Sequence, residues 1–356
     1  MDSYCCRSFC HLRCRHVYRR FVNDRDTRKI SRRSVGIFLL HSWERLLIMS
    51  FEISLGNVLI TLFYILPGFV IGKLKKTSTA HLPTMSAVLI YVCMPCLVLS
   101  SLLSIDYSAD GLAYMGLFFV LTLILQAAFM LLIYLAIRKK SAQPKYRLMT
   151  VGMVLGNVGF FGLPIVRALL PNNPEVASYS AVYSVSMNIL LFTVGVFCLT
   201  GQKKYMSLKS AVLNPTMLGL AVGFPLYLMG AKGFLPPLLV NGISVLGNMS
   251  TPLCMLILGI RLSAVSLPKL FARPSVYVIT LGKLVLFPLF TFFAVKLLPL
   301  PYAFKASMLI LSATPCASAV FNLAELHQCD AELSANCVLL STLLCFLTIP
   351  PLTLLL

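Results

Sequence analysis

The chain has 356 residues, of which 58% are hydrophobic and only 12% are charged, and its mean hydropathy is +0.88. Soluble domains carry about 25% charged residues, so this composition excludes an ordinary soluble domain. The 30 basic residues outnumber the 11 acidic ones, but they stand in short clusters between apolar runs, which is typical of a membrane protein and not of a nucleic-acid-binding domain.

The first 48 residues differ from the rest of the chain. They contain 11 basic and four acidic residues and no apolar run long enough to cross a bilayer. A Cys/His cluster between Cys5 and His16 fits no common zinc-ligand spacing, and Asp24 and Asp26 count against a transit peptide. Met49 stands just before the first apolar run. We therefore expect residues 1–48 to be either a disordered basic extension or sequence upstream of the true start.

From Met49 onward the sequence contains ten apolar runs of about 20 residues, the length of a transmembrane helix. Five of them lie at Ile53–Gly72, Met85–Ile105, Leu112–Ile137, Leu148–Leu170 and Val176–Thr200. After a linker over residues 201–214, five more lie at Pro215–Gly230, Leu238–Ile260, Val276–Leu298, Ala303–Leu326 and Leu333–Leu356. The sequence therefore predicts an all-α polytopic membrane protein with ten transmembrane helices, divided into residues 49–200 and 215–356.

The loops on the two sides of these spans differ in charge. One side carries 14 Lys and Arg residues, whereas the other carries four, which are Arg167, Lys232, Lys296 and Lys305. Cytoplasmic loops hold the excess of positive charge. We therefore expect the linker 201–214 to be cytoplasmic, both ends of the chain to lie outside, and the protein to reside in the plasma or inner membrane.

Each half holds five spans, which is an odd number. A second copy of the same unit would then be inserted upside down relative to the first, as in many secondary transporters. Proline placement supports a repeat: Leu82-Pro83 and Pro95 of span two resemble Leu235-Pro236 and Pro252 of span seven, and Pro164 of span four corresponds to Pro315 of span nine. We expect two inverted five-helix repeats.

Spans four and nine each contain a stretch that disfavours a helix. Span four has GNVGFFGLP, from Gly156 to Pro164, and span nine has SATPCASA, from Ser312 to Ala319. Proline removes an amide donor and clashes with the preceding turn, and glycine permits open conformations. We expect both helices to break there, the alternative being ordinary kinks that serve packing.

A broken helix in a membrane must be buried in protein or line a wet cavity. Each second half-helix would begin at the break with free NH groups and the positive end of its dipole, which suits an anion. No metal or cofactor is required for such a site. The residues expected to bind the substrate are Asn157, Gly159, Gly162, Pro164, Pro315 and Ser318.

For each of three other charged residues in or near the spans, the sequence allows two different roles. Lys283 in span eight could neutralise a substrate charge or partner a carboxylate, or it could extend to the membrane surface. Glu325 could carry a coupling proton, but it stands with Asp330 and Glu332 in a turn where acidic residues would cap span ten. Arg167 could lie on the route of the anion or anchor its helix at the interface.

These motifs resemble the auxin efflux carrier family of permeases, which includes plant carriers and bacterial malate and malonate permeases. The likeness covers about Met49 to Leu356 and rests on NVGFFGLP in span four, Pro315 in span nine and the ending from Leu323 to Leu352. It implies inverted five-helix repeats, with a scaffold formed by spans one, two, six and seven. The resemblance also implies that spans four and nine cross at their prolines, that the substrate carboxylate binds there beside Asn157, and that a homodimer forms.

The sequence thus predicts a secondary transporter of small organic anions, such as mono- or dicarboxylates, that works by alternating access. Its expected partners are the anion and the bilayer, and not nucleic acid. A sodium-coupled symporter of the bile-acid type is the alternative, but no carboxylate lies inside span four or span nine before Glu325. An enzyme would need a base or metal ligands at mid-membrane, whereas His81 and His327 lie at span ends.

Overall fold

The computed structural model describes residues 52–356, apart from 53–54, 58, 61 and 266. The chain divides into two units, residues 1–49 and 50–356, and the described residues belong to the second. The basic extension and its Cys/His cluster therefore lie outside the described residues. Within the described part of the chain the regular structure is helical and no strand is present.

Seven helical stretches in the described residues are long and apolar enough to cross a membrane. They are Thr79–Leu103, Ala109–Lys140, Val176–Thr200, Lys203–Leu228, Pro237–Ala264, Pro274–Lys296 and Ala331–Thr353. Two shorter apolar helices, Val158–Leu169 and Tyr302–Ser312, accompany them. Because about 20 residues span the hydrocarbon core, the prediction of an all-α polytopic membrane protein is confirmed.

The helices of the first half begin with α3 (Ile65–Lys73), α4 (Leu82–Val88), α5 (Met94–Leu103), α6 (Ala109–Ile137) and α7 (Pro144–Gly152). They continue with α8 (Leu163–Leu169), α9 (Val176–Leu190) and α10 (Val196–Thr200). Wider turns of π-helix precede α5, α8 and α10, at Leu89–Cys93, Val158–Gly162 and Leu191–Gly195. Such π-turns often mark functional regions of membrane and soluble helices.

The linker 201–214 contains a single helical turn at Lys203–Tyr205 and the short helix α11 (Leu208–Val212). The second half contains α12 (Pro215–Leu228), α13 (Pro237–Asn248), α14 (Ser250–Ala264), α15 (Leu267–Phe271), α16 (Pro274–Leu281), α17 (Phe287–Lys296), α18 (Tyr302–Ser312), α19 (Ser318–Leu326) and α20 (Ala331–Thr353). A π-turn at Gly282–Leu286 joins α16 to α17.

Local sequence signals set several of these helix ends. The Ser108 hydroxyl accepts a hydrogen bond from the Gly111 NH at the start of α6, and the Asn214 side chain accepts one from the Met217 NH at the start of α12. At the end of α10, Gly201 adopts a left-handed backbone with φ of 70°, where glycine carries no steric penalty. These caps explain why helix boundaries follow polar and glycine positions.

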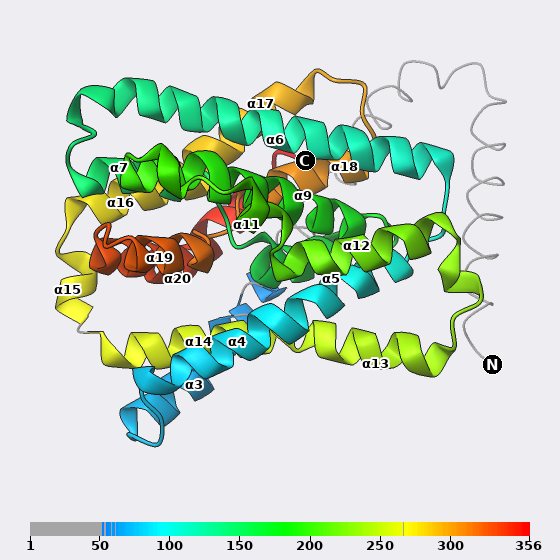
Figure 1. Ribbon diagram of the computed structural model, residues 1–356, viewed down its shortest axis with the longest axis horizontal. Helices are drawn as coiled ribbons and strands as arrows, with labels where there is room; N and C mark the ends of the chain where they lie inside the picture. Colours follow the sequence, from blue (N-terminus) through cyan, green and yellow to red (C-terminus); the bar gives the residue numbers. More distant parts are fainter. Residues whose placement is uncertain (1–51, 53–54, 58, 61, 266) are drawn as a thin grey trace, which may run out of the picture. The chain divides into compact units, whose positions relative to one another are not determined.

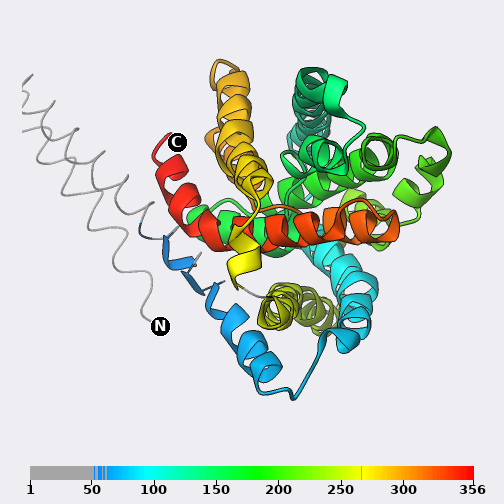
Figure 2. The same ribbon diagram turned by 90° about the vertical axis from the view of Figure 1, so that its left-hand side faces the viewer.

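The helices pack in two groups. One contains α3, α4, α5, α12, α13 and α14, in which α3 lies along α14, and α5 lies against both α12 and α13. The other contains α6 packed on α9, α16 and α19 packed on α20, and α17 packed on α18. Figure 2 shows α3, α4, α5 and α14 of the first group (blue, cyan and olive) on one side of α20 (red). Gly68 and Gly259 let α3 and α14 approach closely, since a Cβ on either glycine would overlap the backbone of the other helix.

Gaps separate consecutive helices at two places, within the glycine- and proline-rich stretches of the predicted spans four and nine; these gaps are called the interruptions below. Helix α7 ends at Gly152 and the next helical turn starts at Val158, while α18 ends at Ser312 and α19 starts at Ser318. In the second interruption Pro315 lies inside the gap, as expected. In the first, the gap lies before Pro164, which occupies the first turn of α8. Pro164 thus lies inside the continuous helical stretch Val158–Leu169, directly after the π-turn Val158–Gly162.

Candidate functional site

The two interruptions pair with each other through their backbones. Gly156 and Cys316 form an isolated antiparallel bridge. The Asn157 amide donates to the Pro315 carbonyl at 2.7 Å, and the Ala317 amide donates to the Leu155 carbonyl at 3.0 Å. Backbone groups that leave a helix inside a membrane need such partners. The backbone pairing therefore joins Gly156 with Cys316 and Asn157 with Pro315.

Gly156 fits at this point because it has no side chain. A Cβ there would lie 2.8 Å from Lys283 Cε and 2.9 Å from its Nζ, and closer still to the Thr314 hydroxyl. Real Cβ atoms do not make contacts this short, so only glycine allows the two backbones and these side chains to meet. The sequence predicted Gly156 as a helix-breaking residue but not as a site residue.

Lys283 lies next to Gly156, at the point where the backbones of the two interruptions pair, which is called the crossing below. It comes from the π-turn between α16 and α17, its exposed fraction is 0%, and its ammonium lies 5.0 Å from the centre of the Phe287 ring. The ammonium donates to the Ser312 carbonyl at 2.5 Å. This carbonyl belongs to the last residue of α18, where carbonyls lack helical partners and the helix dipole is negative. Because Lys283 is fully buried, its side chain does not extend to the membrane surface. Its ammonium donates a hydrogen bond to a backbone carbonyl and not to a carboxylate.

A cavity of about 230 Å³ opens beside the paired interruptions. Its lining includes Asn157, Gly159, Asn188, Ser318 and Asn322 together with apolar side chains. The Asn157 amide nitrogen lies 3.8 Å from the Cys254 sulfur, which is a weak acceptor. The Asn157 side chain is therefore close to the cavity without a strong partner of its own.

The first residues of both second half-helices line this cavity. The amides of Gly159 and Phe160 in one helix, and of Ser318 and Ala319 in the other, have no acceptor within the described part of the chain. Each helix start carries roughly half a positive charge. Two such ends at one cavity favour a negatively charged ligand.

Arg261, near the end of α14, adds a positive charge at the mouth of the cavity. Its guanidinium lies 4.1 Å from the centre of the Phe321 ring, and its buried Nε has no partner among the described residues. Arg261 also lines an adjoining cavity of about 470 Å³, together with Asn322 and Glu325. Arg261 was not among the site residues predicted from the sequence, because it stood among the 14 basic residues of the loops. The available signal was a single arginine directly after the predicted span Leu238–Ile260.

The predicted site residues do not all reach the cavity. Asn157, Gly159 and Ser318 line it, and Pro315 takes part in the backbone pairing. Gly162 instead packs under the crossing, where a Cβ would lie 2.8 Å from Thr314 and 2.9 Å from Leu311. Pro164 is absent from the lining residues, and Glu325 lies exposed on the last turn of α19, where it lines the larger cavity.

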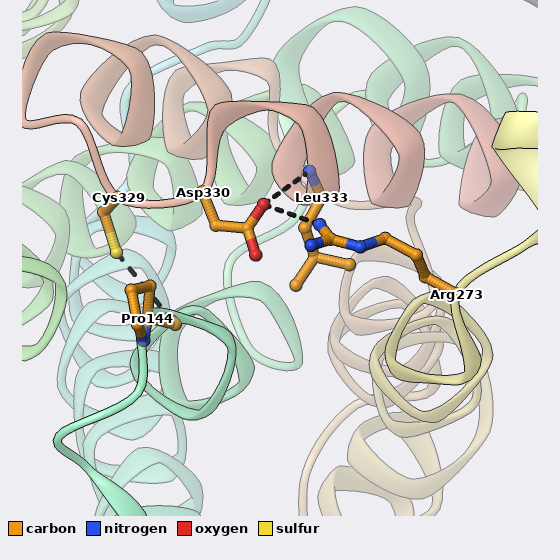
Figure 3. Close-up of polar contacts among 5 residues, drawn as sticks. All are labelled: Pro144, Arg273, Cys329, Asp330 and Leu333. Atoms are coloured by element: carbon orange, nitrogen blue, oxygen red, sulfur yellow. Dashed lines mark hydrogen bonds and ion pairs between the residues drawn. The ribbon is translucent and has the colours of Figure 1, made fainter.

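The turn between α19 and α20 forms a separate polar cluster (Figure 3). The Asp330 carboxylate accepts a hydrogen bond from the Leu333 amide at 3.2 Å and pairs with the Arg273 guanidinium at 2.7 Å. This hydrogen bond raises the pKa of Arg273. Nearby, burial raises the pKa of the Cys329 thiol to about 11. The expected acidic cap of span ten is thus Asp330.

A family model described as membrane transport protein matches residues 53–353, which is most of the chain. The chain belongs to the membrane transport protein family. This is the auxin efflux carrier family that the sequence motifs resemble. One relative, the uncharacterized transporter MJ1031 of Methanocaldococcus jannaschii, is 25% identical over 305 residues, which cover 83% of this chain and 97% of that one. The family is a class of membrane transporters and not of enzymes, so the protein is a membrane transporter.

Proposed function

We propose that this transporter carries small organic anions, such as mono- or dicarboxylates, by alternating access at the paired interruptions. The observation that supports this most directly is the cavity between two helix starts, where four backbone amides lack acceptors among the described residues. A carboxylate could accept from amides of both helices at once. No carboxylate side chain from the described residues lines the 230 Å³ cavity, so none would repel such a ligand there.

We further propose that the chain consists of two inverted repeats of five spans each. The first helix group, with α3, α4, α5, α12, α13 and α14, would be the scaffold, and the group around the interruptions would move against it. Interrupted helices at corresponding places of two repeats are typical of such transporters. On this plan the linker 201–214 faces the cytoplasm of a cell with the protein in its plasma or inner membrane, and the two chain ends lie outside.

Sodium coupling is the alternative mechanism, and Lys283 counts against it. A bound sodium ion needs several oxygen ligands, and carbonyls at a helix end can supply them. The Ser312 carbonyl already accepts a hydrogen bond from the Lys283 ammonium. We therefore expect anion flux to be independent of sodium. Flux that requires a sodium gradient would favour the bile-acid type of symport instead.

Uptake of radiolabelled malate, malonate and indole acetate into proteoliposomes tests the proposal. Asn157→Ala should raise the KM for the transported anion about tenfold or more, because a hydrogen bond to a charged group contributes about 1.5–3 kcal/mol. Asn241→Ala is the matched control, since Asn241 is exposed on α13 and lines neither cavity. Absence of any organic anion flux from folded protein would contradict the proposed function.

A further inference from the structure

A third cavity lies elsewhere in the molecule and shares no lining residue with the two cavities described above. It has a volume of about 450 Å³. Its polar lining residues are Ser100, Ser104, Arg167, Asn173, Ser244 and Asn248, and its apolar ones are Leu170, Pro171, Pro174 and Val176. The polar residues come from α5, α8, the loop after α8, and α13. Residues from both halves of the chain therefore meet around it.

Among the described residues that line this cavity, Arg167 alone is charged. Its guanidinium makes no ion pair or hydrogen bond with any described residue, although the side chain is half-buried. The neighbouring hydroxyls of Ser100 and Ser104 donate to carbonyls of their own helix, at 3.1 Å and 2.7 Å. An unpaired, partly desolvated guanidinium surrounded by neutral polar groups favours a carboxylate, which it can bind through two parallel hydrogen bonds.

The 230 Å³ cavity beside the paired interruptions is called the crossing cavity below. A small apolar cluster lies between it and the Arg167 cavity. Leu97, Leu163 and Ala177 form this cluster, which is buried and separate from the main core. Along α5, Met94 lines the crossing cavity, Leu97 follows one turn later, and Ser100 and Ser104 line the Arg167 cavity. The cluster residue Leu97 thus lies between the two cavities along α5.

The other two helices have the same order. From the π-turn into α8, Phe160 lines the crossing cavity, Leu163 belongs to the cluster, and Arg167 lines the Arg167 cavity.

Helix α9 runs in the opposite direction between the two cavities. From its middle toward its start, Ser184 lines the crossing cavity, Ala177 belongs to the cluster, and Val176 lines the Arg167 cavity. Gly247 of α13 closes against Leu97, where a Cβ would lie 3.0 Å from the Leu97 backbone. Three independent helices therefore place the apolar cluster between the two cavities.

From this arrangement we infer that the Arg167 cavity is an anion-binding vestibule on the membrane face opposite Arg261. Leu97, Leu163 and Ala177 form the closed barrier between this vestibule and the crossing cavity. This inference rests on the proposed function, because the barrier matters only if an anion passes it. The Arg261 side is continuous with the crossing cavity, since Leu258, Arg261, Ser318 and Asn322 line both cavities there. The structure thus corresponds to a state that is open toward Arg261 and closed toward Arg167.

Protection of an introduced cysteine tests the vestibule without relying on transport. Ser244→Cys places a thiol in the wall of the Arg167 cavity, and mass spectrometry can follow its modification by a membrane-impermeant maleimide separately from the native cysteines. Malonate should slow this modification. Added Arg167→Gln should weaken the protection about tenfold, the loss expected for one charge-assisted hydrogen bond, whereas Arg167→Lys should retain part of it.

The controls separate a failure of the vestibule from a failure of the proposed function. Asn157→Ala in the Ser244→Cys background should leave protection by malonate intact, because Asn157 lines only the crossing cavity. Protection that persists in a protein without flux would contradict transport but support the vestibule. Flux with no protection of Ser244→Cys, or with protection unchanged by Arg167→Gln, would overturn the vestibule and leave transport standing. Arg167→Lys keeps the test usable if the glutamine variant does not fold.

The barrier has its own test. A cysteine at Ser184 lies in the crossing cavity, so the same maleimide applied from the Arg167 face should modify Ser184→Cys slowly. Leu97→Ala or Leu163→Ala should speed that modification several-fold, because each removes a buried side chain of the cluster. Equal rates with and without both substitutions, in variants that elute as folded protein, would overturn the barrier.

Discussion

Lys283 donates a hydrogen bond to the carbonyl of Ser312 at the residue where α18 ends. The interruption removes the next turn of helix, so this carbonyl has lost the amide that would have bonded to it. A buried ammonium supplies the missing donor and also faces the negative end of the helix dipole. The charge of Lys283 is therefore tied to the geometry of the crossing and not to the membrane surface.

Lys283→Met should reduce anion flux at least about tenfold while lowering the unfolding temperature by only a few degrees. An unpaired Ser312 carbonyl costs about 1–3 kcal/mol, but loss of a buried charge removes a desolvation penalty that offsets part of this cost. Thermal unfolding in detergent and uptake into proteoliposomes measure the two effects. Flux equal to that of the wild type would show that the ammonium has no part in transport.

Gly156→Ala should destabilise the protein by about 1–3 kcal/mol, since its Cβ would overlap Lys283 and Thr314 in a closely packed region. Gly116→Ala is the matched control. Gly116 lies within α6, nothing lies within 4 Å of the position of its Cβ, and alanine there should stabilise the helix by about 0.5–1 kcal/mol. Opposite shifts in unfolding temperature are expected, and a neutral Gly156→Ala would refute the close approach at the crossing.

Asp330→Ala should cost about 2 kcal/mol of stability. The substitution removes the cap of α20, and alanine is unfavourable at the left-handed backbone of this residue, where φ is 46°. Asp330→Asn should cost less than about 1 kcal/mol, because asparagine still caps the helix and tolerates this conformation. The remaining difference reflects the exposed pair with Arg273 and should shrink at high salt. Equal losses for the two variants would argue against the cap.

Cys329 should react slowly with maleimide near neutral pH. At pH 8 a pKa of about 11 leaves roughly 0.1% of the thiol ionised, compared with roughly 9% at the ordinary value of 9.0. Its labelling should therefore be about one hundredfold slower than that of an exposed cysteine and should rise about tenfold per pH unit between pH 7 and 9. Mass spectrometry of the labelled peptide gives the rate, and rapid labelling of native protein would contradict the burial of this thiol.

Glu325→Gln should lower the KM for the anion a few-fold, because removal of an exposed carboxylate from the cavity shared with Arg261 makes the local potential more positive. The same variant tests the alternative in which Glu325 carries a coupling proton. In that case uptake by Glu325→Gln would no longer respond to an imposed pH gradient. We expect any response seen in the wild type to persist, since Glu325 lies at the rim and not at the crossing.

The membrane class and the positions of the helices could be predicted from the sequence, because both follow from local properties. An apolar run of fixed length is a span wherever it occurs, and the predicted span Val176–Thr200 coincides with the helical stretch in the structure. The two interruptions were also predictable in outline, since proline and glycine act on their own backbone. Even here the place of the first gap depended on context, because the gap lies before Val158 and Pro164 is accommodated inside the helical stretch Val158–Leu169.

Only the tertiary structure decided which residues meet at the site. The pairing of Gly156 with Cys316 joins positions 160 residues apart, and no local pattern records it. Likewise, only the folded chain places Lys283 against the Ser312 carbonyl at the end of α18. It also places Arg261 in the wall of the crossing cavity and Arg167 in the wall of a separate cavity. Such contacts depend on how whole helices pack, whereas hydropathy and helix propensity depend on neighbours along the chain. For this reason the sequence predicted the membrane-protein class and the positions of the spans, but not the geometry of the site.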